Sequence, residues 1–192
     1  MPASPDLDLI NALRRGEPGS TERFLDAYMP RIFSFGMMVC GHREDAEDIA
    51  QESLLSALKA VPELRAPETF HVWLFRIVKR ACYRQRGLHR QQGPAVSVED
   101  LPDAGAELEA GAAWPDEMLL REETRRQVQQ ALATLSAADR LIVLLRDFEE
   151  LPTAEVAGIM DLGESAVKMR LHRARQKLRR LLAPAGDSAP PA

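Results

Sequence analysis

Apolar residues recur at helical spacing over two stretches of the chain, residues 6–90 and 116–182. Breaks divide each stretch, and all but one contain glycine or proline. In the first stretch they fall near 17–19, 40–42 and 61–67, and in the second near 134–136 (Thr-Leu-Ser), 150–152 and 161–163. Each stretch therefore holds about four helices. Neither shows the alternating β-branched pattern of strands, so the sequence predicts an all-α protein.

The segment between the two stretches has no sustained period. Residues 91–115 are rich in Pro, Gly, Ala and acidic side chains, which is typical of an extended linker. We therefore expect two small helical domains, residues 1–90 and 116–183, joined by a flexible acidic linker at 91–115. Residues 184–192 are rich in Pro and Ala and are expected to be a disordered tail.

Charge is distributed unevenly along the chain. The net charge is −4, but residues 91–116 hold 6 Asp/Glu and no Lys/Arg. Basic residues concentrate in two helical segments, with 6 in Phe70–Arg90 and 7 in Glu164–Arg180. Both segments are candidate footprints for nucleic acid.

The strongest local feature is a helix-turn-helix at residues 152–182. Val156, Ile159 and Met160 would face a core, and Asp161 tolerates the left-handed backbone that the turn needs. In the next helix one stripe is apolar: Val167, Leu171, Ala174 and Leu178. The opposite side carries Ser165, Lys168, Met169, His172, Arg173, Gln176 and Arg180. This pattern indicates a helix for the DNA major groove, although a basic helix can also be a merely solvated amphipathic face.

The other basic segment, Phe70–Arg86, has an apolar side and a basic remainder. The remainder contains Arg76, Lys79, Tyr83, Arg84 and Arg86, and suits a DNA backbone. Trp73 lies on the apolar stripe, so core packing is favoured over stacking on a base, and Tyr83 is expected to be the exposed ring.

The preceding helix, Asp45–Ala60, presents Asp48, Gln51, Glu52 and Leu55 opposite its core stripe. Leu55 is either one of the apolar residues that many proteins expose singly, or the anchor of a protein-docking face. An acidic surface of this kind would repel DNA.

Catalytic and metal-binding signatures are absent from the sequence. It contains no phosphate-binding Gly-rich loop, no His-Glu-x-x-His and no nucleophile elbow, and its four histidines are scattered. We therefore expect neither an enzyme nor a cofactor or metal site. Cys40 and Cys82 are expected to be buried, reduced thiols. The chain shows no membrane span or leader, which favours a cytoplasmic protein with no membrane insertion.

With these segments in place, the chain resembles the extracytoplasmic-function (ECF) sigma factors of bacterial RNA polymerase. Asp45-Ala-Glu-Asp-Ile-Ala-Gln-Glu52 is similar to their polymerase-binding motif, and Phe70-His-Val-Trp-Leu-Phe-Arg-Ile-Val-Lys-Arg80 is similar to their promoter-opening helix. Glu155-Val-Ala157 with Val167-Lys-Met-Arg-Leu-His-Arg-Ala-Arg175 is similar to their second DNA module. The resemblance implies a protein that binds core polymerase and directs promoter-specific initiation.

The resemblance also implies residue roles. Residues 1–90 would be sigma region 2 and residues 116–183 sigma region 4, with the linker threading the polymerase channel for nascent RNA. Core polymerase would bind Asp48, Gln51, Glu52 and Leu55. The minus-ten element would contact Glu63, Leu64, Arg65, Arg76, Lys79, Arg80, Tyr83 and Arg84. The minus-thirty-five element would contact Ser165, Lys168, Met169, Arg170, His172 and Arg173.

Several positions depart from the usual family pattern. Arg80 stands where Asn is common, Arg84 where Asp is common, Asp161 where a turn Gly is common, Ala166 where Thr is common, and Met169 where Ser is common. Because base-contacting positions are among them, the resemblance does not specify the promoter sequence. Many relatives are held by an anti-sigma factor, which is therefore an implied partner.

Two other functions fit the same residues. One is a stand-alone helix-turn-helix regulator whose N-terminal bundle senses a ligand or dimerises, and it would bind promoter DNA without polymerase. The other is a helical adaptor or anti-sigma-like binder that uses its basic faces only for proteins, and a steep loss of DNA affinity with added salt would count against it.

Overall fold

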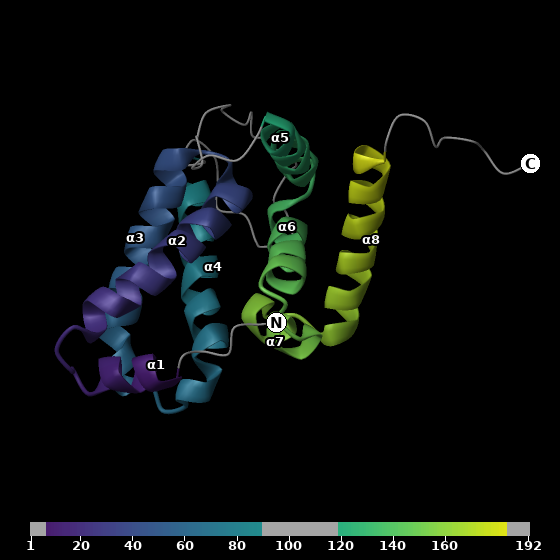
Figure 1. Cartoon of the computed structure of the whole chain (residues 1–192). Coiled ribbons are helices and arrows are strands. Elements are labelled where there is room, and N and C mark those ends of the chain that lie inside the picture. The colour runs from purple at the N-terminus through teal and green to yellow at the C-terminus, as the bar shows by residue number, and fades with distance from the viewer. Residues whose placement is uncertain (1–6, 90–118, 184–192) are drawn as a thin grey trace, which may run out of the picture.

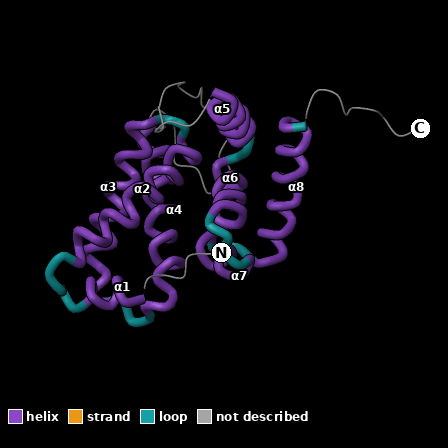
Figure 2. The backbone as a smooth tube through the Cα atoms, viewed as in Figure 1, coloured by secondary structure: helices purple, strands orange, loops and turns teal. Residues whose placement is uncertain are grey.

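The computed structural model describes residues 7–89 and 119–183, and within these ranges every regular element is helical. Figures 1 and 2 show two groups of helices packed side by side, α1–α4 and α5–α8. The α-helices are α1 (Leu7–Arg14), α2 (Ser20–Cys40), α3 (Arg43–Ala60), α4 (Phe70–His89), α5 (Leu119–Ala133), α6 (Ala137–Val143), α7 (Thr153–Met160) and α8 (Glu164–Leu182). The all-α prediction is confirmed, and the linker and tail lie outside the described residues.

Helix boundaries fall where the sequence carries its breaks. Gly19 and Gly41 flank α2 with φ of 74° and 81°, left-handed values that glycine adopts at little cost, and the Gly41 N–H bonds the Met37 carbonyl. Pro62 and Pro67 sit in two short 3₁₀ turns, Val61–Glu63 and Pro67–Thr69, which connect α3 to α4.

The N-terminal bundle depends on a close approach of α2 and α3. A Cβ atom placed on Gly36 would lie 3.1 Å from Ala46 Cα, so a larger residue there would have to push α3 away by a few tenths of an ångström. Phe24, Tyr28 and Phe70 form an aromatic cluster at the other end of the bundle, with centroids 4.9–6.0 Å apart. The apolar stripes predicted for α3 and α4 are buried or half-buried, and Trp73 packs on Phe70 as expected.

The C-terminal helices pack around α6, whose continuation Leu144–Phe148 is π-helical. Leu141, Ile142 and Leu144 are almost fully buried there, and α8 lies against both α5 and α6. Four helices were expected in this part of the chain, and four α-helices are present in residues 119–183.

The two halves share one contiguous apolar core and are also joined by polar contacts. Arg140 of α6 has only 1% of its surface exposed. Its guanidinium donates 2.5 Å to the Val39 carbonyl near the end of α2, and 2.9 Å and 3.3 Å to the Ala133 and Leu135 carbonyls after α5. Because the last carbonyls of a helix have no partner within it, Arg140 satisfies the ends of two helices from different halves.

Replacing Arg140 with Met should lower the free energy of unfolding by about 2–3 kcal/mol, because the methionine fills similar space but leaves buried carbonyls without donors. Urea unfolding followed by circular dichroism measures the loss. Arg146→Met is the matched control, because Arg146 is half-buried and lies on the π-helical turn. Equal stability of the two variants would contradict the role given to Arg140.

His71, on the first turn of α4, is buried beside Tyr28 and Phe70. Burial, with a smaller contribution from the nearby Arg31 cation, lowers the pKa of His71 to about 4. The folded protein therefore holds a neutral imidazole, whereas the unfolded chain binds a proton below the ordinary pKa of 6.5. The stability associated with the neutral ring is complete above pH 6.5 and is lost as the pH falls from there toward 4.

We expect the free energy of unfolding to fall by up to about 3 kcal/mol between pH 6.5 and pH 4 from this residue alone. His71→Gln should flatten the profile in this window, while His172→Gln, at an exposed position, should leave it as in the parent. Urea unfolding at a series of pH values tests this. Parallel profiles for the parent and His71→Gln would exclude His71 as the titrating group.

Candidate functional site

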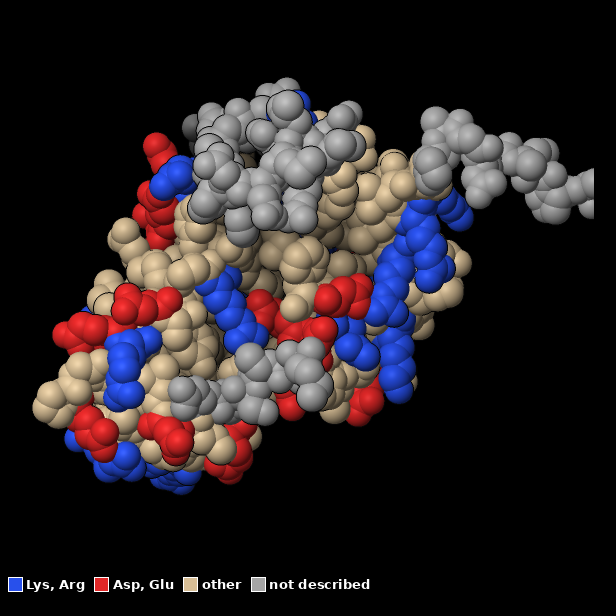
Figure 3. All heavy atoms as spheres, viewed as in Figure 1, with Lys and Arg blue, Asp and Glu red and all other residues tan. Residues whose placement is uncertain are grey.

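The outward side of α8 is a continuous basic face. Lys168, Met169, His172 and Arg173 are exposed along it, with Ser165 at its start. Figure 3 shows Lys and Arg gathered in a stripe along this helix. On the inner side Val167, Leu171 and Ala174 are buried, so the orientation of the face is fixed by core packing.

Arg170 differs from the other predicted contacts on α8. Its side chain is half-buried and lies 3.5 Å from Asp139, the residue that is joined to the N-cap Ser136 of α6. In this conformation Arg170 therefore pairs with a residue of α6, and its contact with the minus-thirty-five element stays a prediction. The sequence missed this pairing because Asp139 lies on another helix.

The turn between α7 and α8 has the geometry that the sequence predicted. Asp161 adopts φ 57° and ψ 41°, the left-handed conformation that short polar side chains tolerate. Gly163 has φ −74°, so its freedom as glycine is not used there, and the N–H of Leu162 bonds the Ala157 carbonyl.

Basic residues of α4 divide among three environments. Arg80 is exposed, and Arg84 forms an ion pair with Glu52 of α3. Arg76 and Lys79 instead face the helix-turn-helix: Arg76 Nε donates 3.2 Å to the Gly158 carbonyl, and Lys79 Nζ lies 2.6 Å from Asp161 Oδ2. Only part of the predicted minus-ten surface is therefore open.

Asp161 lies among basic groups from α4. The hydrogen bond and the charge of Lys79 hold the pKa of this carboxyl below its usual value, with smaller contributions from Arg76 and Arg80. Its carboxylate thus sits where α4 presents positive charge.

Two other residues predicted to contact the minus-ten element are placed differently from the expectation. Leu64 is 8% exposed and belongs to the core, so it anchors the loop between the 3₁₀ turns while Glu63 and Arg65 are exposed beside it. Tyr83 is half-buried against the core with its hydroxyl inaccessible, so it is not the exposed ring that was expected. In both cases the apolar part of the side chain completes the bundle.

The residues of α3 that are predicted to dock a protein lie on one side of the helix. Leu55 is 57% exposed, and Asp48 and Gln51 are exposed on the same side. The face adjoins the end of α4, where Gln85 donates 3.0 Å to Asp45 and 3.3 Å to Asp48. Because Arg84 pairs with Glu52, the polar groups of the face are held in place by α4.

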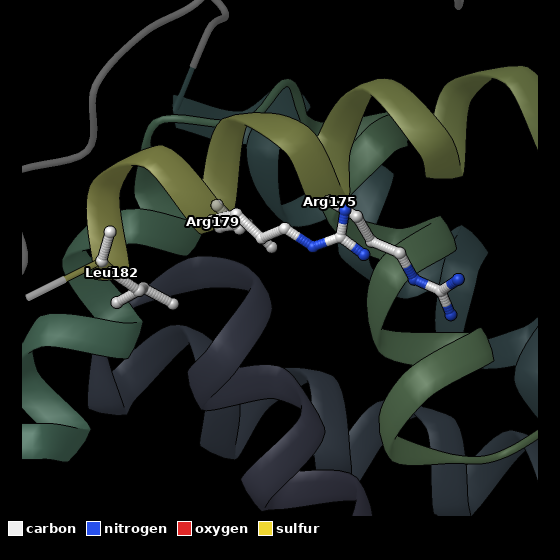
Figure 4. Close-up of a pocket in the computed structure, with 5 residues that line it drawn as sticks. Arg175, Arg179 and Leu182 are labelled. Atoms are coloured by element: carbon white, nitrogen blue, oxygen red, sulfur yellow. The ribbon is translucent and has the colours of Figure 1, made fainter. Parts of the chain in front are cut away.

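A groove at the end of α8 was not predicted. It is shallow, encloses about 420 Å³, and is lined by Arg175, Leu178, Arg179, Leu182 and Ala183. Figure 4 shows Arg175, Arg179 and Leu182 projecting from one side of the helix. The spacing of Arg175, Leu178, Arg179 and Leu182, three and four residues apart, is the signal that could have identified it.

The described residues contain no cluster of three or more His, Cys, Asp or Glu placed to hold a metal ion. Cys40 and Cys82 are buried, as expected. No helix within residues 7–89 and 119–183 is long and apolar enough to cross a membrane.

Two family models match the chain in order. The model for sigma-70 region 2 matches residues 24–93, and the model for sigma-70 region 4 matches residues 125–178. The region 2 match contains α3 and α4, and the region 4 match contains α7 and all but the last four residues of α8.

Curated relatives match over most of their length. The chain is 26% identical to the RNA polymerase sigma-H factor of Pseudomonas aeruginosa, covering 93% of this chain and 94% of the relative. It is also 26% identical to the ECF RNA polymerase sigma factor SigW of Bacillus subtilis, covering 90% and 94%. The ECF RNA polymerase sigma-E factor of Escherichia coli is 28% identical, covering 70% and 72%.

Solved structures share the fold. CnrH in complex with the cytosolic domain of CnrY matches with a TM-score of 0.65 and 21% identity, over 93% of this chain and 97% of that one. The sigma factor RpoE in complex with the anti-sigma factor NepR from Bartonella quintana matches with a TM-score of 0.64 and 23% identity, over 85% and 97%.

Proposed function

Because the chain belongs to the extracytoplasmic-function group of the sigma-70 family, we propose that it binds core RNA polymerase and directs it to specific promoters. The observation that carries this proposal is the presence of three surfaces of different character: an acidic face with an exposed apolar anchor on α3, a basic side of α4 that is partly open, and an exposed basic face on α8. A single DNA-reading domain would need only one of them.

The α3 face is the proposed polymerase contact. Leu55 supplies an exposed apolar anchor, and Asp48, Gln51 and Glu52 surround it with hydrogen-bonding and acidic groups. An apolar centre with a polar rim is the usual composition of a protein interface. Its negative charge favours a basic partner surface and disfavours DNA.

The proposed minus-ten contact combines α4 with the loop before it. Arg76, Lys79, Arg80 and Arg84 would bind phosphates, while the exposed Glu63 and Arg65 would line the pocket for an extruded base. Extruding a base costs a few kcal/mol, which phosphate and pocket contacts can offset. Strand opening then needs binding energy alone, so we propose a factor that is not itself an enzyme and uses no cofactor.

The α8 face is the proposed minus-thirty-five contact. A helix of this size fits the major groove, where Lys168 and Arg173 can bond phosphates or guanine edges and Met169 or His172 can touch bases. We propose the cytoplasm, where polymerase acts, as its compartment. We also propose an anti-sigma factor as a regulatory partner, since relatives of this fold are found bound to such proteins.

Leu55→Asp should abolish binding to core polymerase while leaving the helical circular-dichroism spectrum and the unfolding midpoint unchanged, because the side chain is exposed. Leu54→Asp is the matched control: Leu54 is 1% exposed, so its replacement should unfold the bundle. Pull-down with purified core polymerase measures the binding. Retained binding by folded Leu55→Asp would rule out this face.

Lys168→Ala with Arg173→Ala should reduce promoter-specific transcription by roughly tenfold or more while polymerase binding is retained, because both side chains face outward on α8. Arg15→Ala with Arg23→Ala removes the same charge from exposed positions in the N-terminal bundle and is the control. The assay is transcription by reconstituted core polymerase, with sequencing of transcript starts.

The same reconstitution separates the main proposal from a stand-alone regulator. The proposed function predicts defined transcript starts that need both core polymerase and this chain. Tight promoter binding by the chain alone, without association with polymerase, would refute the proposal in favour of the regulator.

A further inference from the structure

Met169 is an exposed apolar side chain among the polar residues on the outer face of α8. It has 53% of its surface exposed, whereas Val167 and Leu171, two positions to either side, are 0% and 6% exposed. At about 100° of rotation per residue, Met169 lies roughly 170° from the centre of the buried stripe of Val167, Leu171 and Ala174. It therefore points directly away from the core of its half of the protein.

Ion pairs on both flanks of α8 support this orientation. Roughly 100° to one side of Met169 around the helix, Arg170 lies 3.5 Å from Asp139 of α6. Roughly 120° to the other side, Arg175 Nε lies 3.1 Å from Asp147 Oδ2 on the π-helical turn. Because rotation of α8 would break these pairs and expose the buried stripe, Met169 is kept at the centre of the outer face.

Met169 also lies in the part of α8 that would reach the bases. In a helix-turn-helix, the N-terminal residues of the second helix contact base edges in the major groove, and Met169 is in the second turn of α8. Ser165, one turn before it, and Arg173, one turn after it, are exposed on the same side. A DNA groove that accepts these two residues also receives the methionine.

The polar side chains next to Met169 form pairs along the helix. Lys168 Nζ lies 3.6 Å from Glu164 Oε2, toward the start of α8, and His172 Nε2 lies 3.0 Å from Gln176 Nε2, toward its end. These four residues form one row, spaced four apart, beside the position of Met169. The thioether is left uncovered between the two pairs, so DNA that approached this face would meet it.

A methionine discriminates between bases by the groups that it lacks. It has no hydrogen-bond donor and only a weakly accepting sulfur, so it cannot replace water at the guanine acceptors or the cytosine donor. Covering those groups without a partner is costly. The 5-methyl group of thymine, in contrast, is an apolar group in the major groove, and packing a polarisable thioether on it removes apolar surface from water.

We propose that Met169 is a specificity-determining residue that selects thymine in the minus-thirty-five element by packing against its 5-methyl group. This inference rests on the proposed minus-thirty-five contact of α8. Lys168 and Arg173 on the same face would bond phosphates or guanine edges, so the contact with thymine adds an apolar form of base readout to theirs.

The test uses holoenzyme assembled from core polymerase and the full-length chain, on a promoter fragment whose start has been mapped with that holoenzyme. Each thymine of the minus-thirty-five element, on either strand, is replaced in turn by deoxyuridine, which lacks only the 5-methyl group. Competition against a labelled parent fragment measures the affinity for each. We expect deoxyuridine at one position to lower the affinity about fourfold, because one methyl contact is lost there.

Variants at two positions assign this effect to a side chain. Met169→Gln keeps an unbranched side chain of similar length but replaces the thioether with an amide, so its affinities for the thymine and deoxyuridine fragments should be equal. Met169→Leu remains apolar and should retain the preference for thymine. Lys168→Ala is the matched control on the same exposed face: it should weaken binding to both fragments and leave their ratio unchanged.

Three results would overturn the proposal: a minus-thirty-five element without an A·T pair, no position at which deoxyuridine lowers the affinity, or a parent-like preference for thymine in Met169→Gln. In the last case the methyl group would act through the shape of the DNA. Failure of the proposed function shows itself separately, as the absence of transcript starts that need this chain. Defined starts with equal affinity for thymine and deoxyuridine at every position therefore refute the role of Met169 alone.

Discussion

A buried arginine determines how the two halves of this protein meet. Arg140 has a full positive charge and almost no contact with solvent, a situation that is costly unless its donors are satisfied. The carbonyls that satisfy it belong to the ends of α2 and α5, where helix dipoles concentrate partial negative charge. One side chain of α6 thus bonds the ends of both helices.

The two sides of α4 have different roles. Its apolar side completes the N-terminal core, and its basic side is the proposed promoter contact. In the closed arrangement part of the basic side is paired within the protein, with Asp161 and with the Gly158 carbonyl.

The candidate site was predictable to the extent that each surface lies on one helix. The outward set on α8 and the exposure of Leu55 follow from spacing alone, since a helix places residues three and four apart on one face. The residues whose burial or pairing differs from the prediction are those that contact other elements of the fold. Leu64 and Tyr83 are drawn into the core by neighbouring elements, and Arg170 finds Asp139 on another helix.

The sequence by itself determined the helices, their breaks and the two basic faces, because periodicity, glycine and proline act over a few residues. It also determined the left-handed turn at Asp161. Only the tertiary structure decided that Arg140 closes two helix ends, that Glu149 meets Arg31, and that Asp161 rests on Lys79. These pairs lie roughly a hundred residues apart, and no local pattern specifies which charge meets which once the helices pack.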